Sequence, residues 1–306
     1  MAIQINFFIR VLLGWNLRLA HRVVAVFLRL GLVLALLSTS GCAWLDGYQR
    51  QLIYRPTSGV PADFTGLRAG DERYVVSLPG AGAPQHIAIW WLPHATPDAP
   101  TLLYLHGTFR NLFENMHKID ALRAAGYSVL AVDYRGWGES SPITPSESTI
   151  TQDAGMAWAE LKKHQPIAKK RVIYGHSMGS GVAVDLASRL NSPMDYGGLV
   201  LESAFTNFTD VAHASGWLAS LINLFNRERF AALEKIGQVQ APLLMLHGKR
   251  DDTVPIHLGE RLFAAANSPK QWLAMDNAAH SDLDLVNPAL YQATLQDFAA
   301  SYLAIR

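Results

Sequence analysis

The sequence has little of what disulfide scaffolds, metal sites and nucleic-acid binders need. Its 306 residues include a single cysteine, Cys42, which excludes an intrachain disulfide and any multi-cysteine metal site. No HExxH motif or comparable histidine cluster occurs, so we expect no catalytic metal and no cofactor. Charged residues make up 17% of the chain and the formal net charge is +1. Bulk electrostatics therefore favour neither nucleic acid nor a strongly charged partner.

The first part of the chain lacks acidic residues altogether. None occurs before Asp46, whereas several arginines precede an apolar run over Val23–Leu37. Small residues follow at 38–41, and the next residue is Cys42. A basic start, an apolar stretch and small residues in this order are typical of a secretory signal.

The junction Gly41-Cys42 resembles the cleavage site of a bacterial lipoprotein signal. This resemblance implies that Cys42 becomes the lipid-modified first residue of the mature protein. Because Ala43 follows rather than aspartate, it also implies sorting to the outer membrane if the host is Gram-negative. The alternative is an uncleaved anchor over residues 1–41, since the apolar run is close to the length that spans a bilayer. Either interpretation predicts a membrane-attached protein outside the cytoplasm.

Half of the residues are hydrophobic, and the length suits one large α/β domain with an appendage. We expect a tether over residues 42–72 and the α/β domain over 73–306. The residues 51–56 are a short apolar exception within the tether, and we expect them to dock on the domain. Its strands should alternate with helices, which predicts a mostly parallel sheet with helices on both faces. Functional side chains should then follow the carboxyl ends of the strands. The expected strands are 74–78, 86–92, 102–105, 128–132, 171–174, 198–202, 242–246 and 271–275, and the expected helices are 111–125, 148–163, 178–190 and 288–304.

The stretch Gly175-His176-Ser177-Met178-Gly179 lies between an expected strand and an expected helix. In this context G-x-S-x-G places a serine hydroxyl on a sharp turn, and the glycines are needed because neighbouring backbone passes close. The pattern indicates Ser177 as a nucleophile and the amide of Met178 as a donor to an oxyanion. The alternative is an ordinary glycine-rich turn with a capping serine.

A serine nucleophile needs a base, and the base needs an orienting acid, in the chain order Ser, acid, His for this turn. Asp251 and Asp252 follow one expected strand, and His280 follows the next. These loops lie at the same edge of the sheet as Ser177, so the sequence predicts that the three groups meet. Glu202, at the end of the preceding strand, is an alternative acid.

Four motifs in order make the chain resemble an α/β-hydrolase from about residue 74 to the C-terminus, in the branch of bacterial esterases and serine-aminopeptidase-like hydrolases. They are HG at 106–107, GHSMG at 175–179, HG-x-x-D-x-x-V-P at 247–255, and two small residues before His280. The resemblance implies Ser177 as nucleophile, Asp251 as orienting acid and His280 as general base and acid. It selects Asp251 because the acid of this family lies three positions before the valine.

A second oxyanion donor should come from the loop after His106-Gly107. Position in this loop indicates the amide of Thr108, with Phe109 next in line. Residues 205–239 form a long excursion without an expected strand, and we expect a small helical lid there. Its aromatic residues, Trp217 and Phe225 among them, could line an acyl pocket, and core packing fits their helical spacing equally well.

These features predict a serine hydrolase that cleaves carboxylic esters or related acyl bonds of small-molecule substrates through an acyl-enzyme intermediate. A peptidase, a thioesterase or a lysophospholipase would use the same Ser-His-Asp machinery. A membrane-tethered binding module of hydrolase fold is the non-enzyme alternative. Such modules usually lose a triad member, whereas all three positions are filled in this chain.

Overall fold

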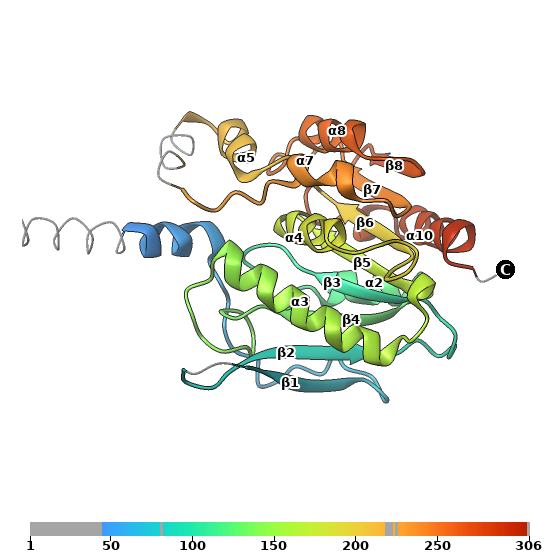
Figure 1. The fold of residues 1–306 in the computed structure, drawn as a ribbon, viewed down its shortest axis with the longest axis horizontal. Coiled ribbons are helices and arrows are strands. Elements are labelled where there is room, and N and C mark those ends of the chain that lie inside the picture. The colour runs from blue at the N-terminus through green and yellow to red at the C-terminus, as the bar shows by residue number, and fades with distance from the viewer. Residues whose placement is uncertain (1–44, 80–81, 218–222, 224–225, 305–306) are drawn as a thin grey trace, which may run out of the picture. The chain divides into compact units, whose positions relative to one another are not determined.

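The computed structural model describes residues 45–79, 82–217, 223 and 226–304. An eight-stranded sheet runs through it in the order β1-β2-β4-β3-β5-β6-β7-β8 (Figure 1). β1 and β4 pair antiparallel with β2, and the remaining neighbours pair parallel. The prediction of a mostly parallel sheet is therefore confirmed. The strands are β1 Glu72–Leu78, β2 Gln85–Leu92, β3 Thr101–Leu105, β4 Ser128–Asp133, β5 Arg171–His176, β6 Gly198–Glu202, β7 Leu243–Gly248 and β8 Lys270–Met275.

The central strands are apolar along their whole length because both of their faces are covered. Every residue of β3, β4, β5, β6 and β7 is buried, as expected for parallel strands between two helical layers. The edge strand β1 contains no buried residue. Since β3 and β5 to β8 run in one direction, their carboxyl ends share one edge of the sheet, where the predicted site residues follow them.

Helices cover both faces of the sheet and enclose a hydrophobic core on each side. One core contains Trp158 of α3, Val182 of α4 and Leu258 of α8, and the other contains Ile119 of α2 and Leu295 of α10. Figure 1 shows α3, α4 and α8 on the near side of the sheet. The helices are α2 Met116–Ala124, α3 Glu147–His164, η1 Ala168–Lys170, α4 Met178–Ser188, α5 Phe208–Ala214, α7 Ala232–Lys235, η2 Ile236–Gln238, α8 Ile256–Ala265, α9 Leu283–Val286 and α10 Pro288–Tyr302.

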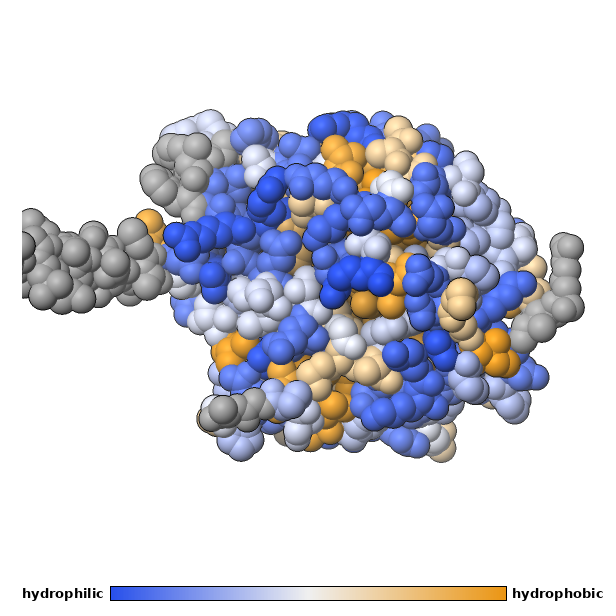
Figure 2. All heavy atoms as spheres, viewed as in Figure 1, coloured by the Kyte–Doolittle hydropathy of each residue, from blue (hydrophilic) through white to orange (hydrophobic). Residues whose placement is uncertain are grey.

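The outer surface of the near helical layer is predominantly hydrophilic. Figure 2 shows polar side chains over most of this face, with hydrophobic side chains scattered among them. A scattered distribution of this kind is normal for a surface that faces water. The hydrophobic residues of α3, α4 and α8 are therefore directed to the sheet.

The chain divides into two units, Met1–Tyr48 and Gln49–Arg306. Residues 45–48 of the first unit are helical, and so are residues 49–54 of the second. Residues 49–54 thus belong to the second unit, and the division into residues 1–41, 42–72 and 73–306 stays a prediction. Within this unit Tyr54 is fully buried, donates a hydrogen bond to Glu228, and packs edge-on against Trp137 and Phe230.

Residues 1–44 lie outside the described part of the chain, so the signal or anchor and the lipidation of Cys42 remain predictions. Among the residues that the structure describes, no helix combines the length and the apolar character needed to cross a bilayer. Residues 218–222 and 224–225, in the middle of the predicted lid, are also outside the described part. The remainder of the excursion over 205–239 contains α5, α7 and η2.

Candidate active site

Ser177 occupies the turn between β5 and α4. Its φ of +53° lies in the left-handed region that non-glycine residues rarely adopt. The flanking glycines have no room for a side chain. A Cβ at Gly175 would lie 2.3 Å from the carbonyl oxygen of Gly179, and one at Gly179 would lie 2.0 Å from that of Leu105. Close packing of the turn against β3 therefore holds the serine in its strained conformation.

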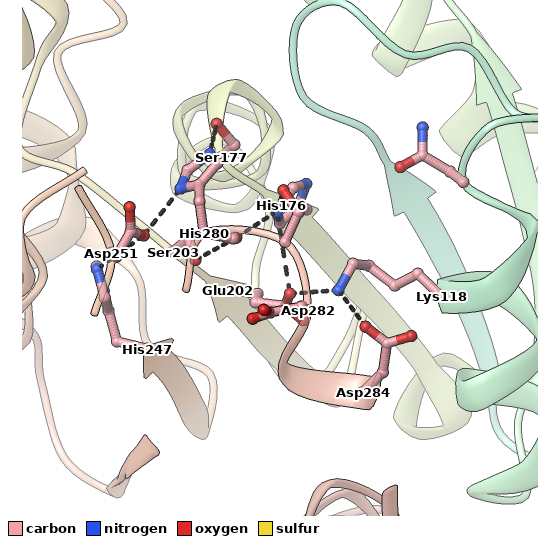
Figure 3. Close-up of polar contacts among 12 residues, drawn as sticks. Lys118, His176, Ser177, Glu202, Ser203, His247, Asp251, His280, Asp282 and Asp284 are labelled. Carbon is pink, nitrogen blue, oxygen red and sulfur yellow. Dashed lines mark hydrogen bonds and ion pairs between the residues drawn. The ribbon is translucent and has the colours of Figure 1, made fainter. Parts of the chain in front are cut away.

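His280 lies between Ser177 and Asp251 (Figure 3). Its Nε2 is 2.8 Å from Oγ of Ser177, and its Nδ1 is 2.8 Å from Oδ2 of Asp251. When Nδ1–H donates to the carboxylate, Nε2 is the acceptor for the serine proton. A hydroxyl, an imidazole and a carboxylate bonded in this order can activate the serine oxygen as a nucleophile.

The carboxylate of Asp251 is buried, and both of its oxygens accept hydrogen bonds. Its Oδ1 accepts hydrogen bonds from the amides of Thr253 at 3.0 Å and Val254 at 2.7 Å, and Nε2 of His247 lies 3.4 Å from Oδ2. Burial raises the pKa of Asp251, but its hydrogen bonds with His247, His280 and the Val254 amide outweigh burial and hold the pKa below its usual range. Asp251 is thus ionised at neutral pH and can stabilise an imidazolium on His280.

The other two candidate acids lie elsewhere. Asp252 is exposed to solvent. Glu202 is fully buried, and its carboxylate bonds with Lys118 and with two tyrosine hydroxyls. Of the three carboxylates that the sequence offers, the structure brings that of Asp251 to the imidazole of His280.

Thr108 and Met178 lie beside the nucleophile, and both line a cavity that includes Ser177. Met178 is the first residue of α4, and the first amides of a helix have no partner within it. The amide of Phe109, the second possible donor in its loop, instead bonds to the carbonyl oxygen of Tyr54 at 3.0 Å. Both residues thus lie beside Ser177, and the role of their amides as oxyanion donors stays a prediction.

Two cavities of different character meet at Ser177, and Thr108, Phe109 and Thr253 line both. One, the polar cavity, has a volume of about 450 Å³. Its lining includes apolar residues, Leu285 among them, and the polar side chains of Arg110, Asn115, His117, Ser281 and Asp282. The other has a volume of about 490 Å³, and its apolar lining includes Leu52, Ile53, Phe205, Phe208 and Val211. A substrate held at Ser177 can therefore place one end among polar groups and the other among apolar groups.

One wall of the apolar cavity comes from the segment just before the sheet. Leu52 and Ile53 line this cavity, and they belong to the helical residues 49–54. The sequence analysis predicted that the apolar stretch over 51–56 docks on the domain but did not assign it to the site. No catalytic motif marks this wall, and the apolar exception within the expected tether is the signal that could have found it.

A second wall comes from the predicted lid. Phe208 and Val211 of α5 line the apolar cavity, so the described part of the excursion over 205–239 contributes to the site. Trp217 takes neither of its two expected places, because its side chain is 78% exposed. Phe225 lies outside the described residues.

The doubly wound sheet, the serine on its strand–turn–helix junction, and the acid and histidine in the loops after β7 and β8 together define the α/β-hydrolase class. Within the described residues, no group of three or more His, Cys, Asp or Glu side chains could hold a metal ion. Residues 96–230 match the family described as serine aminopeptidase, S33. The chain is 32% identical over 259 residues to an uncharacterized protein of Mycobacterium tuberculosis. This match covers 83% of the chain and 88% of that relative. The chain belongs to the α/β-hydrolase family.

Relatives with named activities are also similar to this chain. It is 34% identical over 201 residues to the lysophosphatidylserine lipase ABHD12 of Danio rerio, and the match covers 60% of this chain and 51% of the lipase. The chain therefore spans about half the length of that relative. An esterase structure from Pyrococcus furiosus aligns with a TM-score of 0.65 at 20% identity, covering 81% of this chain and 98% of the esterase. At this identity the likeness shows the fold.

Proposed function

We propose that the protein is a serine hydrolase that cleaves carboxylic esters. Ser177 Oγ attacks the ester carbonyl while His280 takes its proton, and Asp251 stabilises the imidazolium that forms. His280 then gives the proton to the departing alcohol, which leaves an acyl group on Ser177. Water, activated by His280 in the same way, hydrolyses this acyl-enzyme and restores the serine. The observation that carries the proposal is the unbroken hydrogen-bond chain from Ser177 through His280 to Asp251.

The amides of Met178 and Thr108 act as the oxyanion hole in this proposal. As the carbonyl carbon becomes tetrahedral, its oxygen gains negative charge, and preorganised donors stabilise that charge in a water-poor site. The N-terminus of α4 adds the positive end of its helix dipole at the same place. The bond between Phe109 and Tyr54 supports the choice of Thr108, because it commits the neighbouring amide elsewhere.

The two cavities favour a substrate with an acyl chain and a polar alcohol. The acyl chain fits the apolar cavity, and the alcohol fits the polar cavity that Arg110 and His117 border. A lysophospholipid has this composition, and the named lipase relative acts on one. Lysophospholipase activity is therefore the second candidate function, and peptidase and thioesterase activities are the alternatives that a substrate panel must separate from it.

We also propose that the enzyme is attached to a membrane outside the cytoplasm. The support is the basic start, the apolar run over 23–37 and the Gly41-Cys42 junction. Intact mass of protein extracted from membranes distinguishes the two modes of attachment. A chain that begins at a lipid-modified Cys42 supports lipidation, a chain that retains residues 1–41 supports the anchor, and release of the protein by a salt wash alone would contradict both.

Turnover by the detergent-solubilised full chain tests the proposed function. We expect hydrolysis of p-nitrophenyl esters and a loss of roughly 10⁴-fold or more in kcat/KM for Ser177→Ala. Asp251→Asn should lose about 10⁴-fold in kcat, because it holds the wrong imidazole tautomer. The matched control is Asp252→Asn, whose exposed side chain should leave kcat unchanged.

Undiminished hydrolysis by Ser177→Ala would overturn the proposal. A folded wild-type protein that cleaves no ester, thioester, peptide or lysophospholipid would instead favour the binding module. Among active outcomes, the highest kcat/KM across these four substrate classes identifies the bond that the enzyme prefers.

A further inference from the structure

Residues at the carboxyl end of β6 form hydrogen bonds with both Ser177 and His280. The carbonyl oxygen of Glu202 accepts the amide of Ser177 at 2.9 Å, and Oγ of Ser203 donates to the carbonyl oxygen of His280 at 2.9 Å. The amide of Ser203 in turn bonds to the carbonyl oxygen of Leu246 at 2.9 Å, which fixes the serine to the end of β7. Two consecutive residues thus connect the nucleophile turn, the histidine loop and the sheet.

Ser203 is held in a conformation that a serine rarely adopts. Its φ is +50°, and the left-handed region costs a residue with a Cβ roughly 1 kcal/mol or more. The residue is fully buried and borders neither cavity. Strain of this kind persists where the surroundings require it, and the hydroxyl of Ser203 gains the bond to His280 in return.

His176 supplies a second donor to the same carbonyl oxygen. Its Nε2 lies 3.1 Å from the backbone oxygen of His280, so the ring carries its proton on Nε2. Burial, followed by the nearby charge of Lys118, lowers the pKa of His176 well below its usual value, which keeps the ring neutral. His280 lies between elements rather than within one, and these two donors hold its main chain.

Lys118, Glu202 and Asp284 form a buried ion cluster, which connects Glu202 at the end of β6 to α2 and α9 (Figure 3). Lys118 of α2 bonds to Glu202 and, at 3.0 Å, to Oδ1 of Asp284 in α9. Tyr174 and Tyr291 also donate to Glu202. These bonds hold the Glu202 carboxylate, which lies 3.9 Å from Nε2 of His176. The carboxylate that bonds to the His280 ring is therefore that of Asp251.

We propose that Ser203 is a positioning residue for the catalytic base: its hydroxyl holds the main chain of His280, so that the imidazole stays between Ser177 and Asp251. This inference rests on the proposed hydrolase function. Loss of the hydroxyl leaves the carbonyl oxygen of His280 with His176 as its one remaining donor and widens the range of ring positions. Misplacement of a reacting group by about 1 Å can cost 10²-fold in rate, whereas substrate contacts stay intact because Ser203 borders neither cavity.

Ser203→Gly separates positioning from a merely structural role. Glycine adopts φ of +50° without strain, which offsets the lost hydrogen bond and the greater freedom of glycine in the unfolded chain, so the variant should unfold close to the wild-type temperature. Its kcat on a short acyl ester should fall roughly tenfold, with KM within about twofold of wild type. Ser180→Ala is the matched control, because Ser180 is a fully buried serine whose Oγ has no hydrogen-bond partner among the described residues. Its kcat should not change.

Ser203→Thr provides the rescue. It restores the hydroxyl, while a β-branched side chain at positive φ should lower the melting temperature. A positioning role therefore ranks the two variants in opposite orders. The threonine variant should have the higher kcat, and the glycine variant should have the higher melting temperature. A wild-type level of kcat in Ser203→Gly would overturn the proposal even if the enzyme is an active hydrolase. Failure of the wild-type enzyme itself to hydrolyse esters would overturn the proposed function instead.

Discussion

Replacement of Lys118 by methionine removes the cation of the buried ion cluster. The side chain of Lys118 is 1% exposed and lies between Glu202 and Asp284. Burial lowers the pKa of Lys118, but the two carboxylates outweigh burial and raise it. Burial likewise raises the pKa of Asp284, yet the hydrogen bond to His117 and the charge of Lys118 outweigh it and lower the pKa to about 2. Lys118 and Asp284 are therefore charged at neutral pH.

The cost of Lys118→Met follows from the two carboxylates that it leaves without a cation. Breaking a buried ion pair by removing one partner destabilises a protein by about 3–5 kcal/mol. For a domain of this size, 1 kcal/mol corresponds to about 2–4 °C in melting temperature. We therefore expect a decrease of about 6–20 °C, even though methionine fills nearly the same space.

The pH dependence should change between wild type and variant. In the wild type, the lowered pKa of Asp284 contributes stability above its unfolded value of about 3.9, and this is lost as pH falls toward about 2. No slope from Asp284 arises between pH 5 and 8. In Lys118→Met, Asp284 loses the charge of Lys118 and keeps the hydrogen bond to His117, so its pKa rises from about 2. The stability that Asp284 contributes above its unfolded pKa of about 3.9 then becomes smaller, so the loss relative to wild type is larger at pH 8 than at pH 3.

Denaturant unfolding of the solubilised chain at pH 3 and pH 8 measures both effects. Lys249→Met is the matched control, because Lys249 forms an ion pair with Asp276 in which both side chains are exposed, and such pairs contribute little to stability. A free energy of unfolding for Lys118→Met within about 1 kcal/mol of wild type at pH 8 would refute the reasoning. A loss that is larger at pH 3 than at pH 8 would also refute it.

Three further predictions concern the nucleophile turn and the two cavities. Gly179→Ala should lower the melting temperature, since its Cβ would lie 2.0 Å from the carbonyl oxygen of Leu105 and overpacking costs about 1–3 kcal/mol or more; an unchanged melting curve would contradict this. Val211→Trp should fill part of the apolar cavity, so kcat/KM should fall for long acyl esters and persist for acetates, and an unaltered chain-length profile would count against that assignment. Arg110→Ala should raise KM about 2- to 5-fold for esters with an anionic alcohol, as expected for an exposed charge pair, with neutral alcohols as the control; an equal rise for both would exclude charge recognition.

Much of the fold was predictable because the signals are local. The continuous apolar runs of β3 to β7 identify buried parallel strands, and each expected strand has a counterpart in the sheet. The turn at Ser177 was equally accessible, since Gly175 and Gly179 are required by contacts with backbone close to them in the fold. The helix expected over 111–125 begins instead at Met116. Asn111 and Asn115 form side-chain bonds to backbone in the preceding turns, and such bonds compete with helix formation.

The buried ion cluster could not be predicted in the same way, because its partners are distant in sequence. Lys118 is separated from Glu202 by 84 positions and from Asp284 by 166. A lysine within an expected helix is usually exposed, and nothing in its neighbours indicates burial. Ser203 was missed for a related reason, since positive φ at a non-glycine residue depends on tertiary contacts. Glu202 was predicted as a possible triad acid because it lies at the end of a strand. That position alone did not indicate its pairing with Lys118.

The central claim is that Ser177 is an activated nucleophile, and covalent labelling tests it most directly. A fluorophosphonate probe should be added to the solubilised wild-type chain and to Ser177→Ala, followed by intact mass measurement and peptide mapping. The account predicts one adduct on the wild type, located on Ser177, and none on the variant. Equal labelling of both proteins, or an adduct on a different residue of the wild type, would contradict it.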